Sequence, residues 1–480
     1  MHKADIVIVG AGAVGCAVAR ELSMYNVKVI VVDKRPDVGG DASKSNSSII
    51  CTGFDCPPGT LESTLCTTQR AMVEQVVRAL DVPFNICGAV MPAITKEQLS
   101  LLPKIRSEAF ENRVYDVEDL SAEEILELEP EVNPELLGGL YVPREAVIDP
   151  FLFVVAMAEN ATENSVEFLL DHEVTGIRYS GGRIREVETS GGTIETQIVI
   201  NAAGLYCDVI AAMVGECDFV VKPRKGQFFI LDKKTECRVT HIVYPIPTPE
   251  TRGKLILPTV HGNILLGPTA EDLEDKKDHS VTADRLCEVE KECRQLVPGI
   301  NISDAITQYC GLRPNRIPAG FHIGASKSVH GYIGISGVRS TGVSSCLSIA
   351  KHVYKEISDS GFSLDRKRGY IRNRRGITKF SEAAPEQKQT LFEEDRGYGN
   401  VICRCESVTE AELRQAIHRP VGARSLDSVK RRLRTGMGRC QGGFCGPRII
   451  EILAEELQVP VEKICKDATG SHMTIGNLRN

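Results

Sequence analysis

Long apolar runs, internal repeats and low-complexity tracts are all missing from this 480-residue sequence. A membrane-spanning helix needs about 20 apolar residues, so no membrane span is expected. Neither charge sign dominates, since 57 Lys and Arg stand against 64 Asp and Glu, which argues against a chain that coats nucleic acid. The hydrophobic share of 42% and the charged share of 25% argue against disorder and predict a globular protein of several domains.

Cysteine is too sparse for a disulfide scaffold, because the 17 thiols are spread over the whole chain and are odd in number. We therefore expect a cytoplasmic protein with most thiols reduced, in which any membrane contact is made through a partner. Met1-His2-Lys3 and the apolar stretch 6–19 have the outline of a signal peptide. Asp5 and three spaced glycines interrupt that outline, so a cofactor loop explains the segment better.

The clearest motif lies near the N-terminus. The apolar run 6–9 predicts a buried parallel strand, and a glycine-rich loop, a helix and a second apolar strand follow it. Gly10 permits a tight turn, Gly12 lets the backbone approach a pyrophosphate, and Gly15 lets the helix pack closely on the sheet. Asp33 ends the second strand, where its carboxylate can bind a ribose diol. This pattern predicts dinucleotide binding, but it does not separate FAD from NAD.

The loop 39–48, which is rich in small and hydroxyl residues, favours FAD because its donors could lie along a flavin ring. With Asn201-Ala202-Ala203-Gly204, Gly311-Leu312-Arg313-Pro314 and the loop 336–342, it resembles the glycine-oxidase and glycerol-3-phosphate-dehydrogenase superfamily of FAD enzymes. We expect these residues to bind FAD: Gly10, Gly12, Ala13, Gly15, Asp33, Lys34, Ser43, Ser45, Asn46, Ser47, Val174, Ala203, Gly204, Gly337, Thr341, Gly342 and Val343.

A resemblance to a more specific family covers nearly the whole chain. The stretches 129–134 and 142–150, with Lys225-Gly226, resemble the large subunit of anaerobic glycerol-3-phosphate dehydrogenase. Two stretches depart from that subunit, which carries Arg-Asn-His-Gly near positions 44–47 and Gly-Gly-Lys at 337–339. Because those positions face the substrate in the family, the departures keep other substrates open.

The resemblance implies a Rossmann-like α/β domain for FAD, interleaved with an α+β substrate domain whose sheet roofs the flavin. We expect the FAD-binding domain at 1–80, 140–215 and 300–361, and the substrate domain at 81–139 and 216–299. Residues 80–140 read as a solvated helical insertion, because 111–150 carry twelve acids against two bases. The remaining boundaries are a linker at 362–400, a small helical [2Fe–2S] domain at 401–465 and a tail at 466–480.

Four cysteines near the C-terminus form two close pairs, Cys403-x-Cys405 and Cys440-x4-Cys445. Four thiolates can hold a [2Fe–2S] cluster or a zinc ion, but zinc sites rarely use the tight C-x-C spacing. The surrounding sequence resembles the bacterioferritin-associated-ferredoxin-like domain, which implies the cluster. The basic run 430–434 is expected to offset the charge of the cluster and to dock an electron-transfer partner rather than nucleic acid.

Arg313 and Arg339 are the candidate catalytic residues, because each stands in a loop that resembles a flavin-facing one. Two guanidinium groups there could hold a carboxylate or a phosphate. The catalytic base stays unassigned: His261 is expected in an exposed hairpin turn, and packing roles are expected for His241 and Tyr244. Three further cysteines, Cys51, Cys56 and Cys66, read as buried thiols, with a redox role open for the first.

Taken together, these features predict an FAD-dependent dehydrogenase that oxidises a small anionic alcohol, with glycerol 3-phosphate as the leading substrate. The resemblance implies that electrons pass through the [2Fe–2S] cluster to a second flavoprotein or an iron–sulfur subunit. Two alternatives stay open. One is oxidation of an amino acid or a 2-hydroxy acid of the sarcosine, hydroxyproline or hydroxyglutarate type. The other is a non-catalytic electron-transfer subunit.

Overall fold

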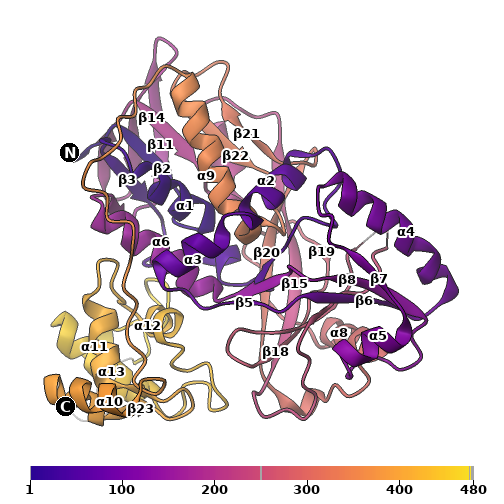
Figure 1. The fold of residues 1–480 in the computed structure, drawn as a ribbon. Helices are drawn as coiled ribbons and strands as arrows, with labels where there is room; N and C mark the ends of the chain where they lie inside the picture. Colours follow the sequence, from indigo (N-terminus) through magenta and orange to yellow (C-terminus); the bar gives the residue numbers. More distant parts are fainter. Residues whose placement is uncertain (1, 249–250, 475, 477–480) are drawn as a thin grey trace.

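The computed structural model describes residues 2–248, 251–474 and 476. Figure 1 shows a sheet with covering helices around β2, a larger sheet around β15, and a small helical domain near the C-terminus. The predicted α/β fold class is confirmed. In the described part of the chain, no helix is both long and apolar enough to cross a bilayer.

The first sheet is built around β2 (Ile6–Val9), in the order β10-β3-β2-β14-β22-β21. Its strands are parallel apart from the last pair. Ile6 and Ile8 pack under the helices, whereas Val7 and Val9 pack on a smaller sheet, so β2 is buried on both faces. The other strands are β3 (Val29–Val32), β10 (Glu167–Leu169), β14 (Ile198–Asn201), β21 (His322–Ala325) and β22 (Tyr332–Ser336).

Helices cover one face of this sheet and the small sheet covers the other. The main covering helices are α1 (Ala13–Leu22), α3 (Val73–Leu80), α6 (Pro150–Glu163) and α9 (Gly342–Asp359), with α2 (Leu61–Arg70) packed against α9. The small sheet contains β1 (His2–Lys3), β11 (Val174–Ser180), β12 (Arg183–Thr189) and β13 (Gly192–Glu195). A short helix, α7 (Cys207–Ala212), follows β14.

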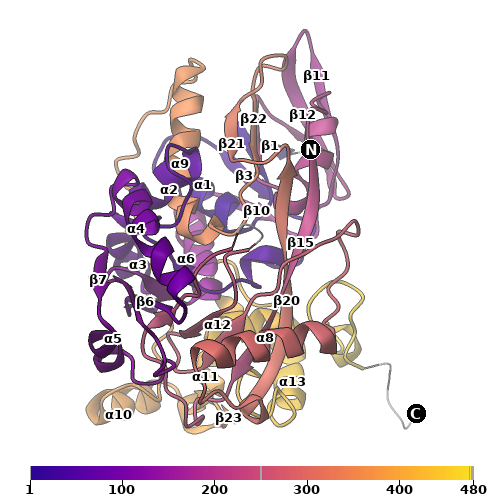
Figure 2. The same ribbon diagram turned by 90° about the vertical axis from the view of Figure 1, so that its right-hand side faces the viewer.

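The larger sheet is centred on two long antiparallel strands, β15 (Val220–Leu231) and β20 (Ala305–Ile317), which pair along their length. Figure 2 shows them side by side through the middle of the molecule. Shorter strands continue the sheet: β6 (Ala89–Ala93), β7 (Glu118–Leu120), β8 (Gly138–Val142), β16 (Ile242–Val243), β17 (Leu255–Pro258), β18 (Ile264–Gly267) and β19 (Glu271–Asp272). The helices of this half are α4 (Lys96–Glu111), α5 (Ala122–Leu128) and α8 (Ala283–Leu296).

Two expectations differ from the observed arrangement. Residues 80–140 hold the expected helices α4 and α5, but β6 and β8 are buried strands of the larger sheet, so a solvated helical insertion describes only part of the segment. β20 falls inside 300–361, which we assigned to the FAD-binding domain, yet it pairs with β15. A small third sheet joins the halves through β4 (Ile49–Ile50), β5 (Phe84–Ile86) and β9 (Ala146–Ile148).

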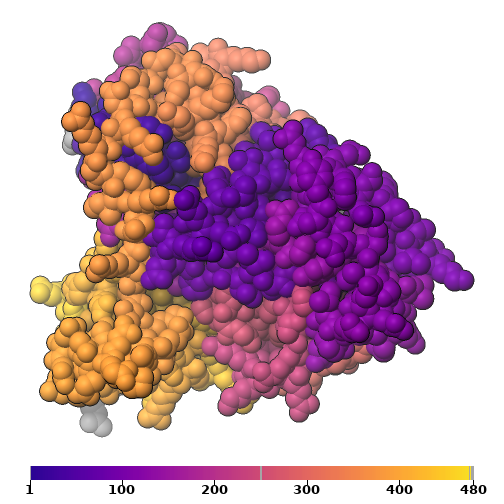
Figure 3. Space-filling view, in the orientation of Figure 1, coloured from indigo at the N-terminus to yellow at the C-terminus, as the bar shows by residue number. Residues whose placement is uncertain are grey.

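The linker at 362–400 crosses the surface and ends in α10 (Pro385–Glu394), as Figure 3 shows in orange along one side. The C-terminal domain follows, with its own apolar core of Ile, Leu and Val side chains. Its elements are β23 (Val401–Cys403), β24 (Val408–Thr409), α11 (Glu410–His418), α12 (Leu426–Leu433) and α13 (Gly446–Leu457).

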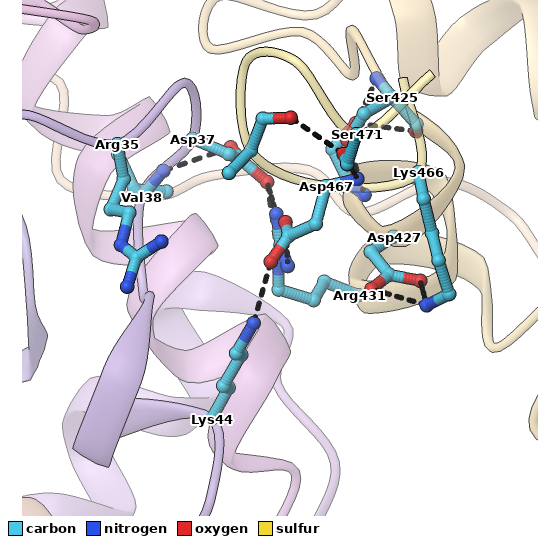
Figure 4. A network of polar contacts seen from close by, with 12 residues as sticks. Arg35, Asp37, Val38, Lys44, Ser425, Asp427, Arg431, Lys466, Asp467 and Ser471 are labelled. Carbon is cyan, nitrogen blue, oxygen red and sulfur yellow. Dashed lines mark hydrogen bonds and ion pairs between the residues drawn. The ribbon is translucent and has the colours of Figure 1, made fainter. Parts of the chain in front are cut away.

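Buried ion pairs attach the C-terminal domain to the first domain. Asp37 accepts hydrogen bonds from Arg431 Nη2 at 2.7 Å and from Arg432 Nη2 at 2.8 Å. Arg431 also contacts Asp467 at 3.0 Å, and Lys44 Nζ donates to the same carboxylate at 2.7 Å (Figure 4). The basic run therefore faces the first domain through Arg431 and Arg432, and these two do not form an exposed docking surface as expected.

We predict that Asp37→Asn weakens this attachment by about 3–5 kcal/mol, because the buried Arg432 loses its carboxylate partner and the buried Arg431 keeps only Asp467. Burial alone would raise the pKa of Asp37, but Arg432 and Arg431 hold it below its usual value. The stabilisation is therefore present at neutral pH and is lost as pH falls through the lowered pKa. Protease cleavage within 362–400 measures detachment. Glu195→Gln, which breaks the exposed pair with Lys3, is the control, and equal cleavage of both variants would contradict the prediction.

Candidate active site and iron–sulfur site

A long cavity lies at the carboxyl end of the first sheet. Thirteen of the residues that we predicted to bind FAD line it: Gly10, Gly12, Ala13, Asp33, Lys34, Ser43, Asn46, Val174, Ala203, Gly204, Gly337, Gly342 and Val343. Arg339 also lines this cavity. Segments far apart in the sequence thus meet around one space.

The other predicted residues lie beside the cavity wall. Gly15 packs α1 against the glycine loop, since a Cβ there would stand 1.8 Å from the Gly10 oxygen. Ser45 Oγ donates to the Asp41 carbonyl at 2.7 Å, and Thr341 Oγ1 donates to Glu62 at 2.9 Å. Ser47 is half-buried in the same loop. These residues shape the cavity rather than form its surface.

The backbone of the glycine loop leaves room for a dinucleotide. A Cβ on Gly10 would meet the Ala202 oxygen at 2.5 Å, and one on Gly12 would meet Ser43 Oγ at 3.0 Å. Ser43 Oγ instead accepts the Ala13 N–H at 2.9 Å, which fixes the loop 39–48 against the start of α1. The amino end of α1 carries no acidic side chain in its first turn, so its dipole is free to hold a pyrophosphate. These residues fit FAD.

Asp33 and Lys34 form the end of the cavity where a ribose would lie. The Asp33 carboxylate accepts N–H groups of Ala11 at 2.7 Å and Arg35 at 2.8 Å. Burial raises the pKa of Asp33, and those two bonds offset part of the rise. Lys34 Nζ sits 3.4 Å from the centre of the Tyr206 ring, which closes this end of the cavity.

Of the two predicted arginines only Arg339 lines the cavity; Arg313 does not, although the next residue, Pro314, does. Arg313 donates to the carbonyl oxygens of Arg224 at 3.2 Å, Lys225 at 3.2 Å and Thr269 at 2.7 Å. Within the described residues it makes no ion pair with a carboxylate. Burial, followed by the nearby Arg224 and Arg339, lowers its pKa to about 10 while Asp272 opposes them, so the group still carries its charge at neutral pH. A half-buried cation that makes no ion pair of its own is suited to binding an anion.

Sequence reasoning missed three further charged residues, none of which lines the cavity. Arg252 pairs with Asp55 at 3.1 Å and lies close enough to Arg313 to lower the pKa of that guanidinium. Glu145 is fully buried, and burial followed by the nearby Cys51 raises its pKa to about 8. No local motif could have identified them, because they stand in loops brought together only by the folding of both sheets.

The histidines lie elsewhere. His261 does occupy the turn between β17 and β18, but its side chain is only 9% exposed and binds Asp149 at 2.8 Å. The expectation of an exposed side chain was therefore wrong, because the hairpin packs against the start of α6. His241 contacts the buried Glu129 at 3.3 Å. Tyr244 does pack in the core of the larger sheet, and its hydroxyl donates to Glu145 at 2.9 Å.

The four C-terminal cysteines come together as two pairs drawn from both motifs. Cys405 Sγ lies 3.6 Å from Cys440 Sγ, close to the edge of a tetrahedron with metal–sulfur bonds of about 2.3 Å. Cys445 donates to Cys403 and thereby lowers the pKa of Cys403 to about 6. The N–H groups of Phe444 and Gly442 lower the pKa of Cys440. Each pair thus has one cysteine that favours the thiolate, whereas the pKa values of the partners, Cys405 and Cys445, are raised.

This arrangement suits two metal ions rather than one. Cys405 pairs with Cys440, and Cys403 pairs with Cys445. Two sulfur pairs at separate points match a binuclear cluster in which each iron takes two thiolates. Gly438 allows the close approach, since a Cβ there would stand 2.3 Å from Cys405 Cβ. Cys403, Cys405, Cys440 and Cys445 would hold the cluster.

Comparison with known proteins supports both sites. The FAD dependent oxidoreductase family matches residues 5–355, and the BFD-like [2Fe-2S] binding domain matches residues 401–455. The chain belongs to the FAD-dependent oxidoreductase family. The predicted cofactors of this FAD-dependent oxidoreductase, FAD and a [2Fe–2S] cluster, are confirmed by these two matches, while their individual ligands remain predictions.

Relatives of this FAD-dependent oxidoreductase cover most or all of it. The glycerol 3-phosphate dehydrogenase of Caloramator mitchellensis is 40% identical over 99% of both chains. One subunit of the anaerobic glycerol-3-phosphate dehydrogenase of Escherichia coli K12 is 25% identical and covers 94% of this chain and 88% of its own. The dithionite-reduced L-alpha-glycerophosphate oxidase of Mycoplasma pneumoniae, solved with FAD bound, has a TM-score of 0.74 and 29% identity, covering 78% of this chain and 98% of its own.

Proposed function

We propose that this oxidoreductase converts glycerol 3-phosphate to dihydroxyacetone phosphate and passes the electrons through its cluster to a partner subunit. The observation that carries the proposal is Arg313, a charged and half-buried guanidinium whose hydrogen-bond partners among the described residues are all carbonyl oxygens. Arg224, Arg339 and Arg252 all act on it, and although Asp272 opposes them, most of these neighbouring charges are positive. A phosphate dianion would relieve that repulsion. The names of the relatives support the same substrate.

Different residues would bind the substrate and support the flavin. Arg313, with Arg339, would hold the phosphate and thereby fix the secondary alcohol at the flavin end of the cavity. When bound, FAD supplies a two-electron acceptor for the hydrogen on that carbon. β20 sets the geometry, because Tyr309 Oη donates to the Asn46 carbonyl at 2.7 Å and Gly311 packs on the Ser45 oxygen. The same strand therefore carries the anion anchor and supports the flavin loop.

Electrons would leave through the cluster. Cys405 and Cys440 are exposed, whereas Cys403 and Cys445 are buried, so one edge of the site faces the surroundings. Phe444 beside it is 53% exposed, with the Arg404 guanidinium 4.3 Å from its ring centre. An aromatic and cationic surface at this edge suits an acidic flavoprotein or iron–sulfur partner. The name of the Escherichia coli relative, which is that of one subunit, supports a multi-subunit assembly.

Anaerobic bleaching of the flavin tests the substrate. We expect glycerol 3-phosphate to bleach the bound flavin fully and glycerol, which lacks the phosphate, to do so far more slowly. Sarcosine, hydroxyproline and 2-hydroxyglutarate complete the panel for the amino-acid and hydroxy-acid alternative. If one of these bleaches the flavin and glycerol 3-phosphate does not, the proposed substrate is wrong. If dithionite alone bleaches it, the non-catalytic electron-transfer role is favoured.

A further inference from the structure

The strand β15 connects the surroundings of the FAD cavity with the loops that carry the iron–sulfur cysteines. In its second half Phe228 stacks on Tyr309 with ring centres 4.8 Å apart, and the Tyr309 hydroxyl donates to the carbonyl of Asn46, which lines the cavity. The strand ends immediately before Asp232 and Lys233. At the rise of about 3.3 Å per residue in a strand, Lys233 lies within about 17 Å of Phe228.

Asp232 binds the loop of one cluster cysteine to the larger sheet. Its carboxylate accepts the Arg439 Nε–H at 2.8 Å, and Arg439 directly precedes Cys440. The other oxygen of the same carboxylate accepts the Lys234 N–H at 2.9 Å, which fixes its orientation. The Asp232 N–H donates to the Asp304 carbonyl at 2.8 Å, so the turn itself is bound to the residue before β20.

Lys233 binds the loop of a second cluster cysteine to the same turn. Its Nζ donates to Glu406 at 2.9 Å, and Glu406 directly follows Cys405. Arg434 Nε donates to the same Glu406 oxygen at 3.1 Å, while Arg434 Nη2 donates to Asn263 in the turn between β17 and β18 at 3.3 Å. The Glu406 side chain is only 7% exposed, so dissolved salt weakens these pairs little.

Packing around these contacts is loose. A cavity of about 900 Å³ lies between the larger sheet, the linker and the C-terminal domain, and Lys233, Cys405 and Arg434 are among the residues that line it. Because side chains leave this space open, packing does not fix the Cys405 loop against the sheet at this point. The pairs of Asp37 hold α12, a different element, to the first domain. The contacts of Asp232 and Lys233 therefore set the position of both cysteine loops relative to β15.

We propose that Asp232 and Lys233 are positioning residues for electron transfer from the flavin to the cluster, an inference that rests on the relay in the proposed function. The reduced flavin gives up two electrons in succession, each of which reduces one iron(III) of the cluster to iron(II), and it releases its protons to water. The partner subunit takes each electron before the next one arrives. Electron transfer slows steeply as two centres move apart, so holding the cysteine loops against β15 keeps this step fast.

The test is the double variant Asp232→Asn/Lys233→Met. It removes one negative and one positive charge, so the net charge beside the cluster is unchanged, and the Asn oxygen can still accept the Lys234 N–H. We expect FAD content, iron content and the rate of flavin reduction to equal those of wild type. Reduction of the cluster by the flavin, followed by freeze-quench electron paramagnetic resonance, should slow by about 10-fold or more. Cluster reduction at the wild-type rate would overturn the proposal.

The far end of β15 provides a matched control. Lys222 pairs with Glu274 at the surface, so Lys222→Met/Glu274→Gln removes an ion pair from the same strand and should leave both rates unchanged. Charge exchange separates positioning from general damage. Arg439→Asp places two carboxylates together and should slow cluster reduction, whereas adding Asp232→Lys restores an attractive pair and should recover most of the rate. If the second substitution recovers nothing, Asp232 does not position the cluster.

Hydrogen exchange gives a readout that does not depend on turnover. In the oxidised holoprotein, peptides that cover 403–407 and 438–442 should exchange faster in the double variant than in wild type. Peptides from α11, which packs in the core of the same domain, should exchange equally in both. Unchanged exchange in both cysteine loops would contradict the proposal. If the double variant does not fold, Lys233→Met alone decides by the same two measurements, because that side chain takes no part in the hydrogen bonds of the turn.

These outcomes are separable from those for the proposed function. If glycerol 3-phosphate fails to reduce the wild-type flavin, the proposed substrate is wrong, and transfer is started instead by illuminating the flavin with EDTA. If the wild-type cluster stays oxidised beside a reduced flavin, the relay is wrong, and the positioning role is wrong with it. If wild type and the double variant reduce the cluster equally fast, only the positioning role is removed and the relay stands.

Discussion

Replacing Arg313 by alanine is expected to slow flavin reduction by glycerol 3-phosphate by about 10²- to 10³-fold in kcat/KM while FAD stays bound. The guanidinium is held by three carbonyl oxygens, so in the wild type it meets the phosphate already oriented. The alanine side chain removes both the charge and the donors. Stopped-flow reduction under anaerobic conditions measures the rate, and the flavin absorbance of the purified protein measures FAD content.

The same strand provides a control for the Arg313 substitution. Arg316, also on β20, donates to the Pro318 carbonyl at 2.8 Å and lies over the Phe219 ring, away from the cavity. Arg316→Ala should therefore reduce its flavin at the wild-type rate. Slow oxidation of glycerol should be the same in wild type and Arg313→Ala, because glycerol has no phosphate to lose contact with. An Arg313→Ala enzyme that works normally on glycerol 3-phosphate would rule out Arg313 as the anion anchor.

Cys440→Ser is expected to stop electron flow beyond the flavin without slowing flavin reduction. A neutral hydroxyl is a much poorer iron ligand than a thiolate, so the variant should contain no [2Fe–2S] cluster. Iron analysis, the visible absorption of the cluster and the electron paramagnetic resonance signal after reduction by glycerol 3-phosphate measure this loss. Reduction of the isolated partner should fall to background.

Cys465→Ser is the matched control for the cluster. Cys465 lies in the same C-terminal domain and is half-buried, but it lies outside the two sulfur pairs. This variant should keep its iron, its resonance signal and its rate of electron transfer. If Cys440→Ser still reduced the partner normally, the electrons would have to leave the flavin directly, and the relay would be wrong.

The local motifs were predictable because their chemistry is contained in short stretches. Strand, glycine loop and helix follow one another within residues 6–22, and each step has a steric reason that a sequence displays. The cysteine pairs are similar, since their spacing and the glycines between them restrict the site to a small set of metals. The FAD and cluster families could therefore be inferred before any coordinate was known.

Long-range pairing was not predictable in the same way. β20 reads as a continuation of the FAD-binding segment, and only its pairing with β15, some ninety positions earlier, places it in the other sheet. The burial of His261 depends on Asp149, which is 112 positions away. Arg252 carries no motif at all, and it became a candidate only because folding brings it beside Asp55, which lies far away in the chain.

The ion pairs beneath the C-terminal domain have a thermodynamic consequence for cofactor affinity. Lys44, which binds Asp467, directly follows Ser43 in the loop that lines the FAD cavity. Ordering of that loop by FAD and attachment of the C-terminal domain therefore favour one another, and linkage requires the two effects to be equal in free energy. The Asp37→Asn protein should accordingly bind FAD more weakly than the wild type does. The C-terminal domain would then be attached most firmly in those molecules that carry FAD, the source of the electrons for its cluster.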